Sequence, residues 1–130
     1  DFGTAITFDV VSRNGEYLGG AISPGVQLSL EALFENAAKL PRVELTEPRH
    51  VIGKSTIESV HSGTIHGFAS LIDGMVAKIQ AELDQKARVI ATGGTVGLIV
   101  SLSNSIDIVD PFLTLEGLRI IHQRNQRDDT

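Results

Sequence analysis

The stretch DFGTAITFDVV, residues 1–11, carries the signal that decides the fold. It places an aspartate, a glycine and a threonine in front of a run rich in β-branched and aromatic residues, although Asp and Gly are both poor strand formers. Asn14-Gly15 follows as a strong turn signal, and a second strand-like run covers residues 17–22. The pattern predicts a β-hairpin over residues 4–22, preceded by a segment that is either a turn or a place where something binds.

A first helix is predicted directly behind the hairpin. Ser23-Pro24 offers a cap followed by a proline at the first helical position. Apolar residues at helical spacing then continue to about Leu40, where Pro41 stops the helix. Residues 42–50 have mixed polarity between prolines, so we expect a loop with at most a short extended piece.

One long helix is predicted in the middle of the chain. Ser55 and Glu58 match a capping box, and apolar residues recur at helical spacing as far as Leu83. Three glycines interrupt this helix, and each costs about 1 kcal/mol relative to alanine; they are Gly63, Gly67 and Gly74. We interpret them as signs that another backbone approaches closely, from the same domain or from a partner chain.

The last third of the chain predicts short strands and helices in alternation. The expected elements are strands over residues 88–91 and 106–109, a brief helix ending at Leu102, and a final helix with apolar positions Leu115, Leu118 and Ile121. A hairpin followed by alternating helices and strands is typical of an α/β fold with helices packed on the faces of a sheet. No linker divides the 130 residues, so we expect one domain with one core.

Composition excludes several classes of function. The net charge of −5 argues against binding along nucleic acid, which depends on clustered Lys and Arg. The sequence has no cysteine, so it offers no disulfide, no thiolate metal site and no cysteine nucleophile. No apolar run approaches the ~20 residues of a membrane helix. We therefore expect a soluble, cytoplasmic protein with no membrane or nucleic-acid partner.

Four stretches put glycine or hydroxyl residues in turns that suit phosphate, because a backbone without a Cβ approaches an anion closely. They are residues 1–4, 19–25, 53–56 and 92–94. The third resembles the end of a Walker A motif, but Pro48 stands where its first glycine would be, so we reject that interpretation. Ser55 is better explained as a helix cap, which leaves the hydroxyl of Thr56 unassigned. His61 and His66 do not form a ligand set, and we interpret them as surface or interface histidines.

These motifs, in this order, resemble the type III pantothenate kinases. The likeness begins at Asp1-Phe2-Gly3-Thr4 and Gly19–Gly25, and continues through Gly53–Thr56, Ala91–Gly94 and Asp110–Arg119. The resemblance implies the ribonuclease-H-like fold of the acetate and sugar kinase, heat-shock chaperone and actin superfamily, in which two such domains hold ATP between them. Residues 1–130 look like the C-terminal domain, with the N-terminal domain absent from this chain.

The resemblance also implies roles for single residues. Asp1 maps onto an aspartate that binds a monovalent cation, potassium or ammonium, and Gly3-Thr4 onto residues beside ATP. Gly93-Gly94 looks like the adenosine-side turn of the superfamily, and Thr56 maps onto a threonine that contacts pantothenate. A hard carboxylate suits a hard cation near phosphates, because phosphoryl transfer depends mostly on positioning and charge neutralisation.

As the resemblance implies, the complete enzyme would use ATP, with magnesium as the expected divalent cation, to phosphorylate pantothenate. This is the first step of coenzyme A biosynthesis, carried out by a homodimer. The family's first phosphate loop and its general-base aspartate belong to the other half, so we expect no catalytic residue here and no activity from this chain alone. A free α-amino group at Asp1 would also compete for the charge of that carboxylate.

One further departure and one alternative remain. His61 and His66 stand where the family usually has glutamine and tyrosine, which affects the pocket or the dimer surface. The alternative function is a non-catalytic nucleotide-binding or transcription-accessory module of the same family.

Overall fold

The computed structural model describes residues 1–37 and 39–127. It opens with the predicted hairpin: β1 (Ala5–Val11) pairs antiparallel with β2 (Tyr17–Pro24). Gly15 lies in the connecting turn at a φ of 83°, a left-handed conformation that glycine adopts without steric cost. The hairpin prediction is confirmed, and β2 extends two residues beyond the predicted Ile22.

The first helix, α1 (Val26–Asn36), starts and ends differently from the prediction. Pro24 is the last residue of β2, and Gly25 is the N-cap, because the Gly25 N–H is already bonded to the Thr4 carbonyl at 2.9 Å. The helix stops at Asn36, whose side-chain amide bonds the Ala32 carbonyl and so competes with continued helix. Of the predicted extension to Leu40, Ala38 lies outside the described residues.

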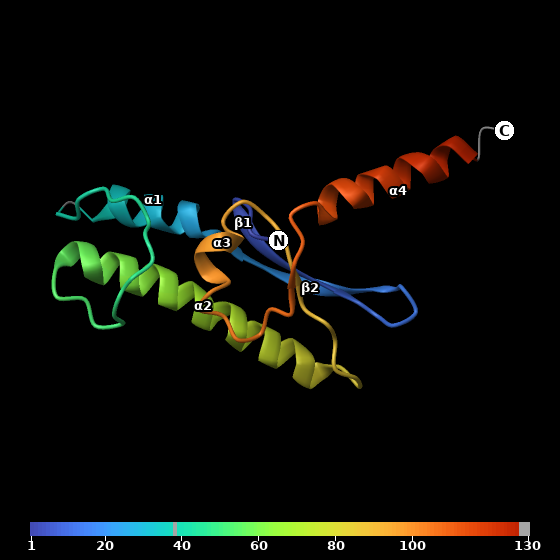
Figure 1. The fold of residues 1–130 in the computed structure, drawn as a ribbon, viewed down its shortest axis with the longest axis horizontal. Helices are drawn as coiled ribbons and strands as arrows, with labels where there is room; N and C mark the ends of the chain where they lie inside the picture. The colour runs from blue at the N-terminus through green and yellow to red at the C-terminus, as the bar shows by residue number, and fades with distance from the viewer. Residues whose placement is uncertain (38, 128–130) are drawn as a thin grey trace.

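The long helix α2 (Thr56–Glu82) confirms the capping-box prediction. Ser55 Oγ accepts a hydrogen bond from the Glu58 N–H at 3.2 Å, and Glu58 Oε2 accepts one from the Lys54 N–H at 2.7 Å. Residues 42–47 before it carry no regular secondary structure, as expected for the predicted loop. In Figure 1, α2 runs along most of the molecule, with α1 beside its first half and the hairpin continuing toward the opposite end.

The remaining elements are shorter than predicted, apart from the last. They are β3 (Ile90–Ala91), α3 (Val96–Ile99), β4 (Ile108–Val109) and α4 (Leu113–Arg127). β3 and β4 pair in parallel, so the described strands form two two-stranded sheets and not one mixed sheet. The two sheets meet where the Phe2 N–H donates to the Thr92 carbonyl at 2.8 Å.

The core lies where α2 passes the start of β1 and the turn after β3. Its buried apolar residues come from all the elements that meet there: Phe2, Ile6, Val26, Ile65, Ala69, Ile72, Ala91, Val96 and Ile99. α4 contributes none of them and projects from the rest of the molecule (Figure 1). Within the described residues, no helix combines the length and apolar character needed to cross a membrane.

Candidate functional site

The loop of residues 1–4 is fixed to the turn that follows β3. Besides the bond from Phe2 to Thr92, the Phe2 carbonyl accepts hydrogen bonds from Thr95 Oγ1 at 3.3 Å and from the Thr95 N–H at 3.4 Å. The Phe2 side chain is buried in the core, whereas Asp1 and Gly3-Thr4 on either side of it are exposed. The fold therefore anchors the middle of the loop and presents its ends to solvent.

Two glycines allow this close approach. Gly93 has a φ of 106°, and a Cβ there would lie 2.5 Å from the Phe2 nitrogen and 2.6 Å from Asp1 Oδ1. A Cβ on Gly25 would lie 2.3 Å from the Thr4 carbonyl oxygen. Real Cβ contacts are essentially never this short, so no other residue fits at either position without displacement of the loop. The shape of the loop thus depends on residues far apart in sequence.

Gly94 differs from its neighbour. No described atom lies within 4 Å of the position that its Cβ would occupy, and the residue is exposed. Gly93 therefore shapes the turn, while Gly94 leaves an open backbone surface next to it in the chain. An open glycine backbone of this kind is suited to contact with a ligand.

The two aspartates near this loop have different environments. The Asp9 carboxylate accepts hydrogen bonds from Thr7 Oγ1 at 2.9 Å and from the Tyr17 hydroxyl at 3.1 Å, so it is bonded within the hairpin. The exposed Asp1 carboxylate lies against Gly93. The α-amino group of Asp1 donates to the Thr7 carbonyl at 2.8 Å; burial lowers its pKa, and the charge of Asp9 opposes that shift.

The donor set beside Asp1 fits a particular class of cation. Within residues 1–37 and 39–127, no three His, Cys, Asp or Glu side chains gather as a metal-binding group. A protein cage for a divalent cation normally uses several carboxylates, whereas magnesium that accompanies phosphates needs only one or two. An exposed carboxylate that belongs to no such group is therefore compatible with a monovalent cation, or with a metal that arrives with a nucleotide.

A groove of about 480 Å³ extends from this loop between β1, α2 and β3. Its polar lining includes Asp1, Thr7 and Thr92 near the loop, and also Asp9, Gln80, Arg88 and Thr114. Leu113 and Thr114, at the start of α4, line the same groove. The groove therefore connects the exposed loop with the projecting helix.

Thr56 lies elsewhere. It is the first residue of α2, and α2 begins at the end of the molecule that is remote from the N-terminus (Figure 1). The structure thus brings Asp1, Gly3-Thr4 and Gly93-Gly94 together and leaves Thr56 apart from them. Its predicted role is not supported by any contact with that group of residues.

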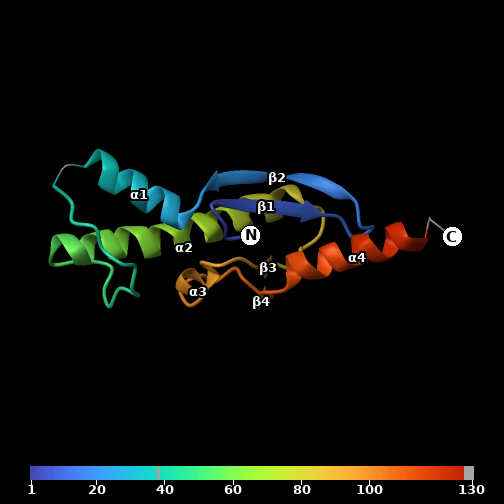
Figure 2. The same ribbon diagram turned by 90° about the horizontal axis from the view of Figure 1, so that it is seen from above.

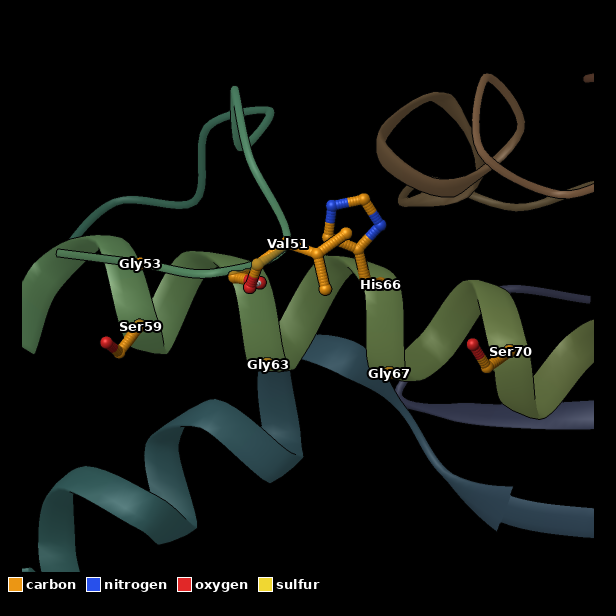
Figure 3. A pocket seen from close by; sticks show the side chains of 8 residues that line it. Val51, Gly53, Ser59, Gly63, His66, Gly67 and Ser70 are labelled. Atoms are coloured by element: carbon orange, nitrogen blue, oxygen red, sulfur yellow. Dashed lines mark hydrogen bonds between the residues drawn. The ribbon is translucent and has the colours of Figure 1, made fainter.

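A second, shallow pocket of about 370 Å³ follows α2 near Thr56 (Figure 3). Its lining consists of Val51, Gly53, Ser59, Ser62, Gly63, His66, Gly67 and Ser70. Ser62 Oγ donates to the Val51 carbonyl and so fixes the preceding loop to the helix. Figure 3 shows the His66 ring rising from the helix on the Val51 side.

His61 and His66 are half-buried, so neither is a simple surface residue. His61 Nδ1 lies 3.3 Å from Thr46 Oγ1, within hydrogen-bond distance. The Nε2 atoms of both rings are buried without a hydrogen-bond partner among the described residues. Both atoms are enclosed by the chain itself, so the interpretation as surface or interface histidines stays a prediction.

Sequence reasoning missed the residues that join the loop to the turn. Phe2 appeared only as a neighbour of the glycine motif, and Thr95 was not singled out. The position of Phe2 between two exposed polar segments was the available signal, because an aromatic side chain there has to be buried somewhere. No signal in the sequence pointed to Thr95.

Comparison with known proteins gives a consistent result. The family model for type III pantothenate kinase matches residues 1–78. A type III pantothenate kinase from Myxococcus xanthus is 57% identical over 125 residues, which are 96% of this chain and 49% of that protein. Relatives with the same description from Moorella thermoacetica and Geotalea daltonii are 55% and 52% identical and cover 96% and 97% of this chain, each over 49% of its own length.

The chain therefore spans about half the length of the relatives that it matches. A solved structure from Campylobacter jejuni, described as a Baf family transcriptional activator, is similar with a TM-score of 0.66 and 22% identity. The match covers 96% of this chain and 56% of that one. This structural likeness concerns the fold alone.

Proposed function

This chain belongs to the type III pantothenate kinase family, and we propose that it is the C-terminal half of an enzyme that phosphorylates pantothenate with ATP. The product would be 4'-phosphopantothenate, in the first step of coenzyme A biosynthesis. The general-base aspartate would come from the other half, so the chain alone would be inactive. The relatives, each about twice the matched length, support this division.

The observation that carries the proposal is the junction between residues 1–4 and the turn after β3. Phe2 and Gly93 hold this junction together, and Gly3-Thr4 and Gly94 are exposed beside it. A hydroxyl and free backbone N–H groups next to glycine are the groups that bind phosphate oxygens. The Gly3 N–H is bonded to the Ala5 carbonyl at 3.1 Å, so Gly3 would contribute by the close approach that it allows. Thr4 and Gly3 would thus face the phosphates of ATP, and Gly93-Gly94 its adenosine side.

Asp1 would bind the monovalent cation, potassium or ammonium. Its exposed carboxylate lies beside Gly93 and belongs to no group of three or more acidic, histidine or cysteine side chains among the described residues, which suits a singly charged ion. When bound, the cation would neutralise phosphate charge next to the loop. A divalent cation, with magnesium expected, would accompany ATP.

The fold assigned by the resemblance, a ribonuclease-H-like domain, is part of the proposal. The antiparallel hairpin, the parallel β3–β4 pair and the hydrogen bond from Phe2 to Thr92, which joins the loop before β1 to the turn after β3, support it. The missing half would supply the second domain. The enzyme would be cytoplasmic.

We also propose that the enzyme is a homodimer. Apart from the neighbouring residues and backbone of α2 itself, no described atom lies within 4 Å of the Cβ positions of Gly63, Gly67 and Gly74, so the glycines of α2 are not explained by packing within the described domain. A second protein backbone can approach such a face closely. Thr56 would contact pantothenate from this helix. Because the acceptor hydroxyl has to reach the γ-phosphate of ATP, the Thr56 beside a given loop of residues 1–4 would be that of the second copy.

The proposal is tested with a chimera in which this chain replaces the matching half of the Moorella thermoacetica relative. We expect ATP-dependent formation of phosphopantothenate that potassium or ammonium activates. Asp1→Ala should abolish potassium activation, and Asp84→Ala, at an exposed residue, should not. A folded chimera that binds ATP but never phosphorylates pantothenate would favour the non-catalytic alternative, and unchanged potassium dependence in Asp1→Ala would remove Asp1 from the cation site.

A further inference from the structure

The first half of α4 exposes an unusual amount of apolar surface. The residues of this surface, called here the α4 apolar face, are between 39% and 67% exposed: Phe112, Leu113, Leu115, Leu118, Ile120 and Ile121. The other side of the helix carries the ion pair of Glu116 and Arg119. A contiguous apolar patch beside a polar stripe marks a surface that another protein segment covers.

The position of this face indicates what covers it. Leu113 and Thr114 line the same groove as Asp1 and Thr92, so α4 leaves the domain at the edge of the candidate nucleotide site. If a second domain completes that site, it has to lie across the groove, next to the first turn of α4. From that turn the helix α4, which carries the α4 apolar face, continues outward toward the C-terminal end (Figure 2).

The relatives identify a candidate of the right size. They extend for about as many residues again as they share with this chain, because the matched 125 residues are 49% of the Myxococcus xanthus protein. We infer that the α4 apolar face is the docking surface for that other half, and that α4 acts as an arm which carries it against the groove. This inference rests on the proposed function for the identity of the second half, but it concerns assembly and not catalysis.

The test is co-expression of the tagged 130-residue chain with the half of the Myxococcus xanthus relative that it does not match. The disrupting variant is Leu118→Asp with Ile121→Asp, two exposed positions one turn apart on the α4 apolar face. The control is Gln123→Asp, which adds the same charge on the side of Glu116 and Arg119. All three side chains are exposed, so circular dichroism should report the same helix content for every variant.

We expect the wild-type chain and Gln123→Asp to retain the other half on the affinity resin. The double variant should retain at most about one tenth of the amount that the wild-type chain retains. Equal retention by the double variant would overturn the inference, as would failure of the wild-type chain to retain the half. Sedimentation of the chain alone tests whether a second copy of the chain covers the α4 apolar face instead. The inference would also be overturned if the chain formed a dimer that the double variant dissociates, while the double variant still retained the other half on the resin. Assembly without phosphorylation of pantothenate would contradict the proposed function and leave the docking surface supported.

Discussion

At the scale of single residues, Gly93 and Gly94 have different roles although they are adjacent. The Cβ of Gly93→Ala would meet the Phe2 backbone and Asp1 Oδ1, at a φ of 106° that alanine rarely adopts. We expect this substitution to lower the free energy of unfolding by about 2 kcal/mol or more, from strain and overlap together. Gly94→Ala should change it by less than about 0.5 kcal/mol, because its Cβ position is open.

Urea denaturation of the two variants, followed by circular dichroism, makes this comparison directly. Equal losses in both variants would show that the loop and the turn are not in close contact. The sequence located both glycines as a turn that suits a phosphate. It could not separate their roles, because the atoms that exclude a side chain at Gly93 belong to residues more than 90 positions away.

At the scale of elements, Asp73 fastens α2 to the segment after α3. Its carboxylate accepts hydrogen bonds from Ser103 Oγ at 2.6 Å, from Ser105 Oγ at 2.7 Å, and from the Asn104 and Ser105 N–H groups at 3.1 Å. Burial would raise the pKa of Asp73, but the bonds from these hydroxyl and amide groups outweigh it and hold the pKa below its ordinary value. The ionised form is therefore the one that the folded state favours.

This shift predicts the sign of a pH dependence. Because the folded pKa lies below the unfolded value of about 3.9, the stabilisation is complete above that value and is lost as the pH falls through the folded pKa. Asp73→Asn should lower the free energy of unfolding by about 1–2 kcal/mol at neutral pH. In this variant the free energy of unfolding should also fall less steeply as the pH is lowered. Denaturation curves from neutral to acidic pH measure both effects, with exposed Asp84→Asn as the control. A variant with an unchanged acid slope would exclude Asp73 as the titrating group.

Elements differ in how well the sequence predicts them, for physical reasons. α2 was predicted with its first residue because the capping box of Ser55 and Glu58 is a local signal. α1 begins later than the sequence predicts, after Gly25 and not at Pro24. The hydrogen bond from the Gly25 N–H to the Thr4 carbonyl is a tertiary contact, and it outweighs the local preference for proline at the first helical position. The apolar residues of α4 predicted its helix correctly, but their burial depends on a partner that the described residues do not supply.

At the scale of the whole molecule, the two small sheets share one core, and Phe2 lies at the point where they meet. Its side chain is 4% exposed and packs in a cluster with Ile6 of β1, Ala91 of β3 and Ile99 of α3. The backbone bonds of Phe2 to Thr92 and Thr95 reach the turn after β3 from the same residue. The sequence alone predicted one continuous sheet. In such a sheet, several hydrogen bonds between neighbouring strands would have joined the two strand pairs.

The joining role of Phe2 predicts that one truncation affects the entire fold. Phe2→Ala should lower the free energy of unfolding by about 3–5 kcal/mol, a large part of the ~5–15 kcal/mol of a typical domain. Phe112→Ala is the matched control: its ring is 67% exposed, so the loss should stay near 0.5 kcal/mol.

Urea denaturation measures both losses of stability. Hydrogen exchange at the Thr95 amide, which is bonded to the Phe2 carbonyl, reports whether the sheets separate. Phe2→Ala removes the ring but leaves the backbone bonds of residue 2 in place. If it costs no more stability than Phe112→Ala and the Thr95 amide stays protected from exchange, contacts other than the Phe2 ring join the two sheets.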